Sequence, residues 1–324
     1  MADRAEPGLM SEVHEHRGSV CRVWNFQDGK PGHENQAAGL LQALARLVTL
    51  QVEDKKPFGF LQLVKCLLGG RPCSALPDIV IGTGHATHLS VLAAARCCDA
   101  KSIVIMKPSL PLAWFDLCFV PEHDRVKAGA QCVLTKGVFN RISFHARPAP
   151  GKQQTGLILL GGVSRHYAWN SAVVAAQIEE IVLGDARPWI VAGSRRTPAD
   201  FPASLPAEVG RRVRFVAAGQ TGRDWLPEQL ARCNPVWVTE DSVSMVYEAL
   251  SSGAACGLLK VVQGSEQDRP DNKLAAGIER LVAEEYIVPF TRWRQGVALQ
   301  PPREPFNEAE RCARIVYQRW LKKN

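Results

Sequence analysis

Short apolar runs alternate along the chain with segments whose apolar residues recur at helical spacing. Such runs are typical of buried strands when turn residues bound them, and apolar residues three or four apart are typical of helices. Strands are expected at residues 20–26, 78–81, 102–106, 115–124, 157–162, 189–192, 212–219 and 254–262. Helices are expected at residues 37–47, 89–94, 171–183, 225–233, 243–250 and 308–323. This alternation predicts parallel sheets covered by helices.

The alternation is interrupted near the middle of the chain. Residues 146–156 (ARPAPGKQQTG) are rich in proline, glycine and polar residues, so we expect an interdomain linker there. A chain of 324 residues is also longer than one core usually supports. We predict two doubly wound, Rossmann-like α/β domains facing a cleft, at residues 19–148 and 155–305, after a disordered terminus at residues 1–18. The last helix, within residues 306–324, is expected to pack back on the first domain.

The composition narrows the class of ligand. The 39 basic and 32 acidic residues give a formal charge of +7, spread along the chain, which favours anionic ligands or a membrane surface. No recognised module and no interleaved run of basic and aromatic residues points to nucleic acid. The ten cysteines form no C-x-x-C pair, so we expect no metal site and a reducing, cytoplasmic setting. No window is apolar over the length of a membrane span, so membrane contact would be peripheral.

Polar turns that carry arginines follow two strands of the second half. The residues expected to bind phosphate there are Gly161, Gly162, Ser164 and Arg165 after the first strand, and Ser194, Arg195 and Arg196 after the second. Guanidinium groups pair with phosphate, and a Gly-Gly turn exposes backbone N–H groups. Together the turns predict a diphosphate cradle, although a solvated surface turn is the alternative for the arginine pair.

The stretch 238–253 (VTEDSVSMVYEALSSG) predicts a strand, a polar turn and a helix. The residues that supply turn and N-cap chemistry are Thr239, Glu240, Asp241 and Ser242. Glu248 shares a helix face with Ser244, because residues four apart are neighbours on a helix. Free N–H groups at the helix start attract phosphate, and Glu248 can accept two ribose O–H bonds. The stretch suits a nucleotide-diphosphate sugar, and a well-capped surface helix is the simpler interpretation.

Glycine-rich loops follow two strands of the first half. The residues expected on the acceptor side of a cleft are Gly29, Gly32, Gly82, Gly84 and His85, with Asp28 and His33 beside them. The glycines let the backbone approach a ligand, and His33 would project over the carboxyl end of the sheet or else brace its own loop. Neither loop matches a Walker A sequence or a three-glycine dinucleotide fingerprint, so no cofactor is expected.

The stretch from Lys55 to Arg71 combines an apolar helical pattern with basic residues. Its apolar residues are Phe58, Phe60, Leu61, Leu63, Val64, Leu67 and Leu68. Lysines at 55, 56 and 65 and the arginine at 71 flank them. This combination suits a helix lying on an anionic bilayer, and it suits a buried helix as well.

Longer motifs resemble those of a known family. DGKPGHENQ, GTGH, LLGGVSRH, GSRRTP and TEDSVSMVYEAL together span nearly the whole chain and resemble the mitochondrial fission "elongated mitochondria" family, which has bacterial and plant members. More remotely, the layout is similar to that of GT-B glycosyltransferases such as the peptidoglycan N-acetylglucosaminyltransferase. The second resemblance implies a nucleotide-sugar on the second domain, with Glu248 on its ribose, and an acceptor near His33.

The leading hypothesis is a metal-independent GT-B glycosyltransferase whose substrate is a nucleotide-diphosphate sugar. Arginines and helix N-termini would neutralise the departing diphosphate, and His33 or Asp28 would deprotonate the acceptor. The sequence names no acceptor, but docking of the stretch from Lys55 to Arg71 on a cytoplasmic membrane face would favour a lipid-linked one. Two alternatives remain: a nucleotide-sugar epimerase or hydrolase, and a non-catalytic adaptor, since the fission-family resemblance implies recruitment of a protein partner.

Overall fold

The computed structural model describes residues 20–68, 70, 75–147, 154–164, 167–261 and 272–322. The expected disordered terminus at residues 1–18 and residues 148–153 of the expected linker lie outside these ranges. Two residues named above, Arg71 and Arg165, also lie outside the described residues.

The first half forms a parallel sheet, in the strand order β2-β1-β3-β4-β5-β6 among the described residues. Its strands are β1 (Cys21–Phe26), β2 (Leu50–Lys55), β3 (Ile79–Thr83), β4 (Lys101–Ile105), β5 (Leu117–Pro121) and β6 (Cys132–Thr135). Helix α1 (Pro31–Ala45) packs on one face and α3 (His88–Cys98) on the other. Helix α2 (Phe60–Leu67) packs against α3. The inner strands are apolar runs because both faces of the sheet are covered.

The second half repeats this plan, in the order β12-β11-β10-β7-β8-β9. Its strands are β7 (Gly156–Leu160), β8 (Trp189–Gly193), β9 (Val213–Val216), β10 (Val236–Thr239), β11 (Cys256–Leu259) and β12 (Val288–Pro289). One face carries α6 (Trp225–Arg232), α7 (Val243–Ser251) and α8 (Asn272–Ala283). The other carries α4 (Ser171–Leu183), α5 (Ala207–Arg212) and α9 (Phe290–Arg294). The prediction of two doubly wound α/β units is confirmed.

The strand order of each sheet identifies where a ligand would bind. The order reverses between β1 and β3 in the first sheet, and between β7 and β10 in the second. Loops leave such neighbouring strands in opposite directions, which opens a crevice at their carboxyl ends. The loops that follow these four strands carry most of the residues selected from the sequence.

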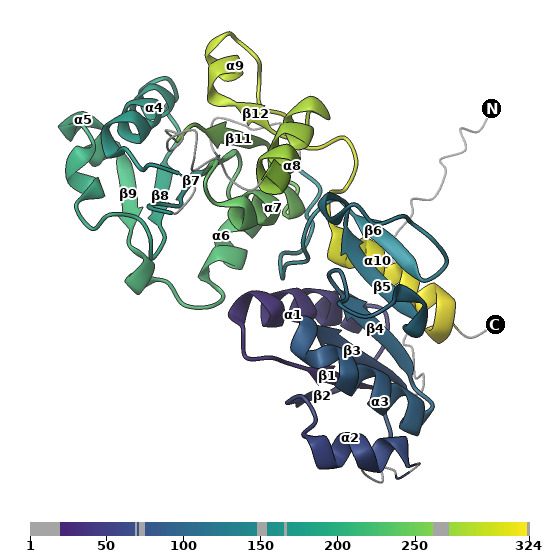
Figure 1. Ribbon diagram of the computed structural model, residues 1–324. Coiled ribbons are helices and arrows are strands. Elements are labelled where there is room, and N and C mark those ends of the chain that lie inside the picture. The colour runs from purple at the N-terminus through teal and green to yellow at the C-terminus, as the bar shows by residue number, and fades with distance from the viewer. Residues whose placement is uncertain are drawn as a thin grey trace, which may run out of the picture.

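Two segments connect the halves. The chain after β6 leaves the first core at Phe139 and enters the second at Ile142, ahead of the expected linker. Helix α10 (Glu308–Val316) returns to the first half, where Cys312 and Val316 are buried beside Leu40 of α1. In Figure 1 this yellow helix accordingly lies with the purple and blue elements of the first half.

Candidate functional site

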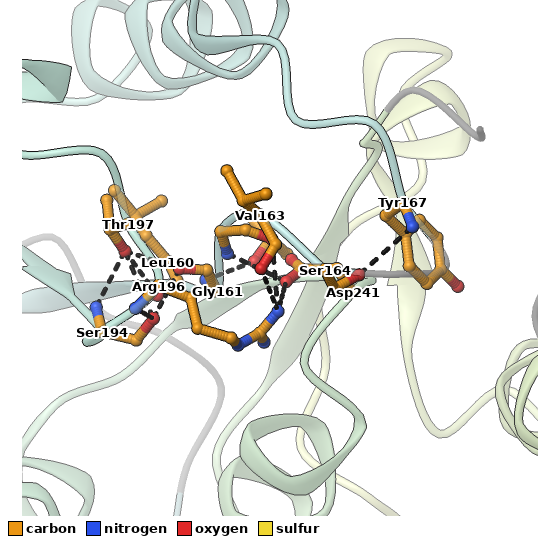
Figure 2. Close-up of polar contacts among 11 residues, drawn as sticks. Leu160, Gly161, Val163, Ser164, Tyr167, Ser194, Arg196, Thr197 and Asp241 are labelled. Atoms are coloured by element: carbon orange, nitrogen blue, oxygen red, sulfur yellow. Dashed lines mark hydrogen bonds and ion pairs between the residues drawn. The ribbon is translucent and has the colours of Figure 1, made fainter.

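The loops that follow β7 and β8 are joined into one unit (Figure 2). The Ser194 and Thr197 hydroxyls each donate a hydrogen bond to the Gly161 carbonyl oxygen at 2.5 Å. Gly162 has a φ of +145°, and a Cβ there would collide with the Arg196 backbone. Only glycine fits this position, so the Gly-Gly sequence lets the second loop lie directly on the first.

The loop after β10 completes the unit. The Gly161 N–H donates to the Thr239 hydroxyl at 2.7 Å, and the Gly162 N–H donates to Asp241 Oδ2 at 2.9 Å. The expectation that these N–H groups are exposed for a diphosphate is therefore wrong. A polar residue at each strand end already satisfies them, because a buried backbone donor needs a partner. Thr239 and Asp241 thus stabilise the loop after β7 through hydrogen bonds to its backbone.

Arg196 is held in place by Asp241. Its Nη1 lies 3.0 Å from Asp241 Oδ2, and the Asp241 side chain is completely buried. The same nitrogen donates to the Gly162 carbonyl at 3.2 Å. Asp241 Oδ1 is buried without a hydrogen-bond partner among the described residues. A buried carboxylate is costly unless a cation meets it, so Asp241 fixes the Arg196 guanidinium, which stays partly exposed at the surface of the unit.

A cavity of about 570 Å³ opens beside this unit, and we call it the arginine cavity. Its walls are apolar at Leu159, Trp225, Leu226 and Met245, and its other lining residues are Ala192, Gly193, Ser194, Arg195, Arg196, Ala218, Thr221, Gly222, Arg223 and Ser242. None of the described residues that line it carries a carboxylate. Arg195 and Arg223 are exposed and have no ion-pair partner in the described part of the chain. Unpaired guanidinium groups over an apolar wall suit a ligand that joins a flat ring to phosphate.

A second cavity, of about 290 Å³, lies between the halves, and we call it the interdomain cavity. Its lining residues are His123 and Val138 of the first half and Arg196, Asp241, Ser242, Val243, Ser244, Tyr247 and Gly277 of the second. It shares Arg196 and Ser242 with the arginine cavity. The N-terminus of α7 begins at that shared boundary. Its first N–H groups and the positive end of its dipole favour an anion there.

In the first half, Asp28 and His33 form a hydrogen-bonded pair. His33 Nδ1 lies 2.8 Å from Asp28 Oδ2, and the Asp28 side chain is 4% exposed. Burial alone would raise the pKa of Asp28, but the hydrogen bonds from His33 and from the Lys30 N–H lower it below its ordinary value. Asp28 therefore stays ionised and orients the imidazole.

The glycines of the first half have different roles from one another. A Cβ at Gly84, where φ is +91°, would collide with both His33 and Asp28. Gly82 allows α3 to approach, because a Cβ there would meet Val91 and Thr87. Gly32 has open space around it, and His85 is exposed in the turn before α3.

The start of α1 differs from the expectation. The helix begins at Pro31, so Gly32 and His33 belong to its first turn rather than to a free loop. Proline is favoured in that first turn because it has no N–H to satisfy. Gly29, with a φ of +78°, turns the chain just before the helix.

The family is decided by a match along the chain. The model of the family described as mitochondrial fission ELM1 matches residues 31–320. The chain belongs to the ELM1 family. No curated protein matches the sequence.

Solved structures show the fold of this ELM1-family chain. UDP-GlcNAc 2-epimerase from Methanocaldococcus jannaschii is 12% identical with a TM-score of 0.53, covering 93% of this chain and 100% of that one. MurG from Acinetobacter baumannii is 11% identical with a TM-score of 0.50, covering 94% and 100%. A structure from Listeria monocytogenes whose protein is assigned as a UDP-N-acetylglucosamine 2-epimerase is 12% identical with a TM-score of 0.50, covering 94% of this chain and 98% of that one. The fold is GT-B-like, as the sequence predicted.

Two carboxylates of the ELM1-family chain are placed differently from the rest of the expected donor site. Glu240 accepts a hydrogen bond from the Val261 N–H at 2.8 Å and lines a separate cavity with Lys260. Glu248 lies on α7 one turn beyond Met245, is half-buried, and lines neither the arginine nor the interdomain cavity. Burial raises the pKa of Glu248 to about 7. Glu240 therefore lies apart from the other residues that were expected to bind the donor. The ribose contact of Glu248 stays a prediction.

The sequence patterns did not predict several residues that line the arginine and interdomain cavities. Arg223 follows β9 in a glycine-containing turn, GQTGRDW at residues 219–225, at the same edge as the turns after β7 and β8. Its position after a strand, shared with the polar turns after β7 and β8, could have identified Arg223 from the sequence. His123 and Tyr247 gave none, because they meet only when the two halves come together. Ser164, which was expected on phosphate, accepts a hydrogen bond from the Tyr167 N–H at 3.1 Å.

Among the described residues, no group of three or more His, Cys, Asp or Glu side chains is placed to hold a metal ion. No helix in the described ranges is long and apolar enough to cross a bilayer.

Proposed function

We propose that this ELM1-family chain is a metal-independent glycosyltransferase that uses a nucleotide-diphosphate sugar. The observation that carries the proposal is the pair of cavities that share Arg196 and Ser242 at the α7 N-terminus, one of them lined by Arg195, Arg196 and Arg223. Fixed cations and helix dipoles aimed at a departing diphosphate can replace a metal, because they need no reorganisation when charge develops. A fold neighbour named for UDP-GlcNAc supports a nucleotide-sugar as ligand.

The nucleotide is assigned to the arginine cavity. A base would lie against Trp225 and Leu226, and Arg195 and Arg223 would meet the phosphates. Arg196, fixed by Asp241, would sit where the diphosphate passes the start of α7. Each guanidinium would donate to oxygens that carry more negative charge as the sugar leaves.

The base that activates the acceptor is assigned to His33. If Nδ1 donates to Asp28, Nε2 carries the lone pair and can accept a proton from an acceptor hydroxyl. Asp28 would then orient the ring and stabilise the imidazolium rather than take the proton itself.

Isothermal titration with UDP-, GDP-, CMP- and dTDP-sugars tests the proposal. We expect one donor class to bind wild type, and the double variant Arg195→Ala/Arg223→Ala to bind it at least ten times more weakly, since each charged hydrogen bond contributes about 1.5–3 kcal/mol. Arg211→Ala, an exposed arginine on α5, is the matched control and should bind like wild type. No binding of any donor by wild type would reject every enzyme assignment.

Turnover separates the enzyme classes. Conversion of the bound donor with no acceptor present would indicate an epimerase or a hydrolase in place of a transferase. An adaptor that keeps only the fold would tolerate the double arginine variant without loss of its biological role. That result, together with an absence of donor binding, would favour recruitment of a protein partner.

The proposal includes a peripheral membrane contact through α2. Phe60, Leu61 and Leu68 are 79%, 81% and 83% exposed, so the alternative of a buried helix does not apply to these three side chains. Lys56 and Lys65 are exposed beside them. Exposed apolar side chains among lysines suit the interface of an anionic bilayer.

Vesicle co-sedimentation tests this contact. Wild type should sediment with vesicles that contain phosphatidylglycerol and less with pure phosphatidylcholine. Phe60→Ser/Leu61→Ser should reduce binding about tenfold or more, because each exposed side chain would otherwise bury its apolar surface. Val173→Ser/Leu183→Ser, two partly exposed positions on α4, is the matched control. Equal sedimentation of both double variants would refute the α2 contact.

A further inference from the structure

Of the histidine, arginine and aspartate side chains that line the interdomain cavity, only that of His123 lacks a hydrogen-bond or ion-pair partner among the described residues. Arg196 and Asp241 in its wall are paired with each other, and Tyr247 is buried against Phe306. His123 is half-buried and makes no hydrogen bond or ion pair within the described ranges. It belongs to the first half, whereas the start of α7, which lines the same cavity, belongs to the second.

The His123 backbone is held in this position by contacts between the halves. Residues Glu122–Asp124 form a 3₁₀ turn directly after β5, and this turn packs against α8. Glu122 forms an ion pair with Arg280 of α8, and Arg280 pairs with Glu284 at 2.6 Å. Lys136 of the first half also bonds Glu284, at 2.8 Å. An imidazole on so constrained a turn is suited to contact a ligand at a fixed place.

The order of groups along the two cavities indicates which part of a ligand His123 would meet. The arginine cavity is large enough for a nucleotide, and the shared boundary at Arg196 and Ser242 is where a diphosphate would pass. A group attached to the far phosphate would continue into the interdomain cavity. At about 290 Å³ that cavity is near the lower limit of ligand pockets, roughly 300–1,000 Å³, so it suits one sugar rather than a second nucleotide.

We infer that His123 is a specificity residue that contacts the sugar of the donor, supplied by the half of the molecule that does not bind the nucleotide. This inference rests on the proposed function, since it assumes a nucleotide-diphosphate sugar in the arginine cavity. Either ring nitrogen of an imidazole can donate to a sugar hydroxyl or accept from one. The contact would make the sugar, in addition to the nucleotide, a determinant of donor affinity.

Comparison of a nucleoside diphosphate with its sugar derivative tests this role. The probes are UDP and UDP-N-acetylglucosamine, followed by the corresponding GDP and dTDP pairs if those bind better. We expect His123→Ala to bind UDP within about twofold of wild type and the sugar derivative about tenfold more weakly. His123→Gln, which keeps a donor and an acceptor, should recover part of the loss.

A matched control and thermal melting complete the design. His145→Ala removes an exposed histidine from the segment that joins the halves and should bind both probes like wild type. Equal effects of His123→Ala on both probes, or none on either, would overturn the inference, whereas nucleotide binding by wild type would still support the proposed function. If wild type binds no nucleotide and no nucleotide-sugar, the proposed function fails and the inference fails with it. A melting temperature close to that of wild type shows that the variant is folded.

Discussion

Asp241 connects three loops of the second half through one buried carboxylate. It accepts from the Gly162 N–H and pairs with Arg196, and its own position follows directly from the end of β10. A ligand would therefore meet the arginine, and the carboxylate would set where that arginine lies. Both groups were expected to touch the ligand, because a sequence reveals which polar residues follow strands but leaves their partners undetermined.

Glu248, on helix α7 of the same turn-helix segment, gives a pH-dependent prediction. Burial raises its pKa from 4.5 to about 7, so the folded state retains a proton that the unfolded state releases between these values. The stability from this group is present below about pH 4.5 and is lost as the pH rises through 7. Relative to Glu248→Gln, wild type should lose on the order of 3 kcal/mol of unfolding free energy between pH 4.5 and 8, at about 1.4 kcal/mol per pKa unit.

Urea denaturation of both proteins across this pH range measures the difference. Parallel stability curves for wild type and Glu248→Gln would contradict the raised pKa. The same variant addresses the ribose contact, since loss of a carboxylate that accepts two O–H bonds should weaken nucleotide binding about tenfold. A stability change without a binding change would assign Glu248 to the fold alone.

At the scale of elements, Gly39 lets helix α1 approach the segment that connects the two halves. A Cβ at Gly39 would collide with the backbone of Asn140, in the segment where the chain passes from the first core to the second. Gly39→Ala should therefore destabilise the protein by about 1–3 kcal/mol through overpacking, although alanine is the better helix former. Gly210→Ala, in α5 with open space around it, should stabilise by up to about 1 kcal/mol.

Thermal melting of the two variants provides the comparison. Opposite shifts in melting temperature are expected, because the substitution is the same and only the surroundings differ. A stabilised Gly39→Ala would show that α1 can move away from Asn140 at little cost. The contact between α1 and the connecting segment would then not fix their relative position.

The elements that could be predicted from the sequence are the buried ones. Strands such as β3 and β7 are continuous apolar runs, because helices cover both of their faces. The edge strand β2 was missed, since four of its six residues are exposed and carry no apolar run. Helix α8 was missed as well, next to a polar segment without periodicity. Edge strands follow from pairing with a neighbour, which a single segment does not encode.

At the scale of the whole molecule, the first core depends on the last helix. Ala309, Cys312, Ala313 and Val316 of α10 are buried against α1, and Arg46 pairs with Glu310 at 2.6 Å. Truncation after residue 305 should expose this face of the first half and destabilise it by several kcal/mol, at about 25 cal/mol per Å² of apolar surface. Amide hydrogen exchange in α1 should accelerate much more than exchange in α4.

The substitution Ala313→Asp is a milder version of the same test. It places a charge in the buried contact between α10 and α1, and the same pattern of exchange is expected. Unchanged exchange in α1 for both proteins would show that the first half keeps its core without α10. The arrangement of the halves around the interdomain cavity was beyond sequence analysis, because His123 and Tyr247 are far apart in the chain and meet only in the assembled molecule.

The return of α10 also affects how the protein is made. A ribosome releases the chain from its N-terminus, so all strands of the first sheet emerge before α10 has been synthesised. At roughly 5–20 residues per second, the interval between β6 and the end of α10 lasts roughly 10–40 s. During that time the apolar face of α1 lacks its cover and is available to chaperones. Translation must reach the last helix before the first half can reach its native stability.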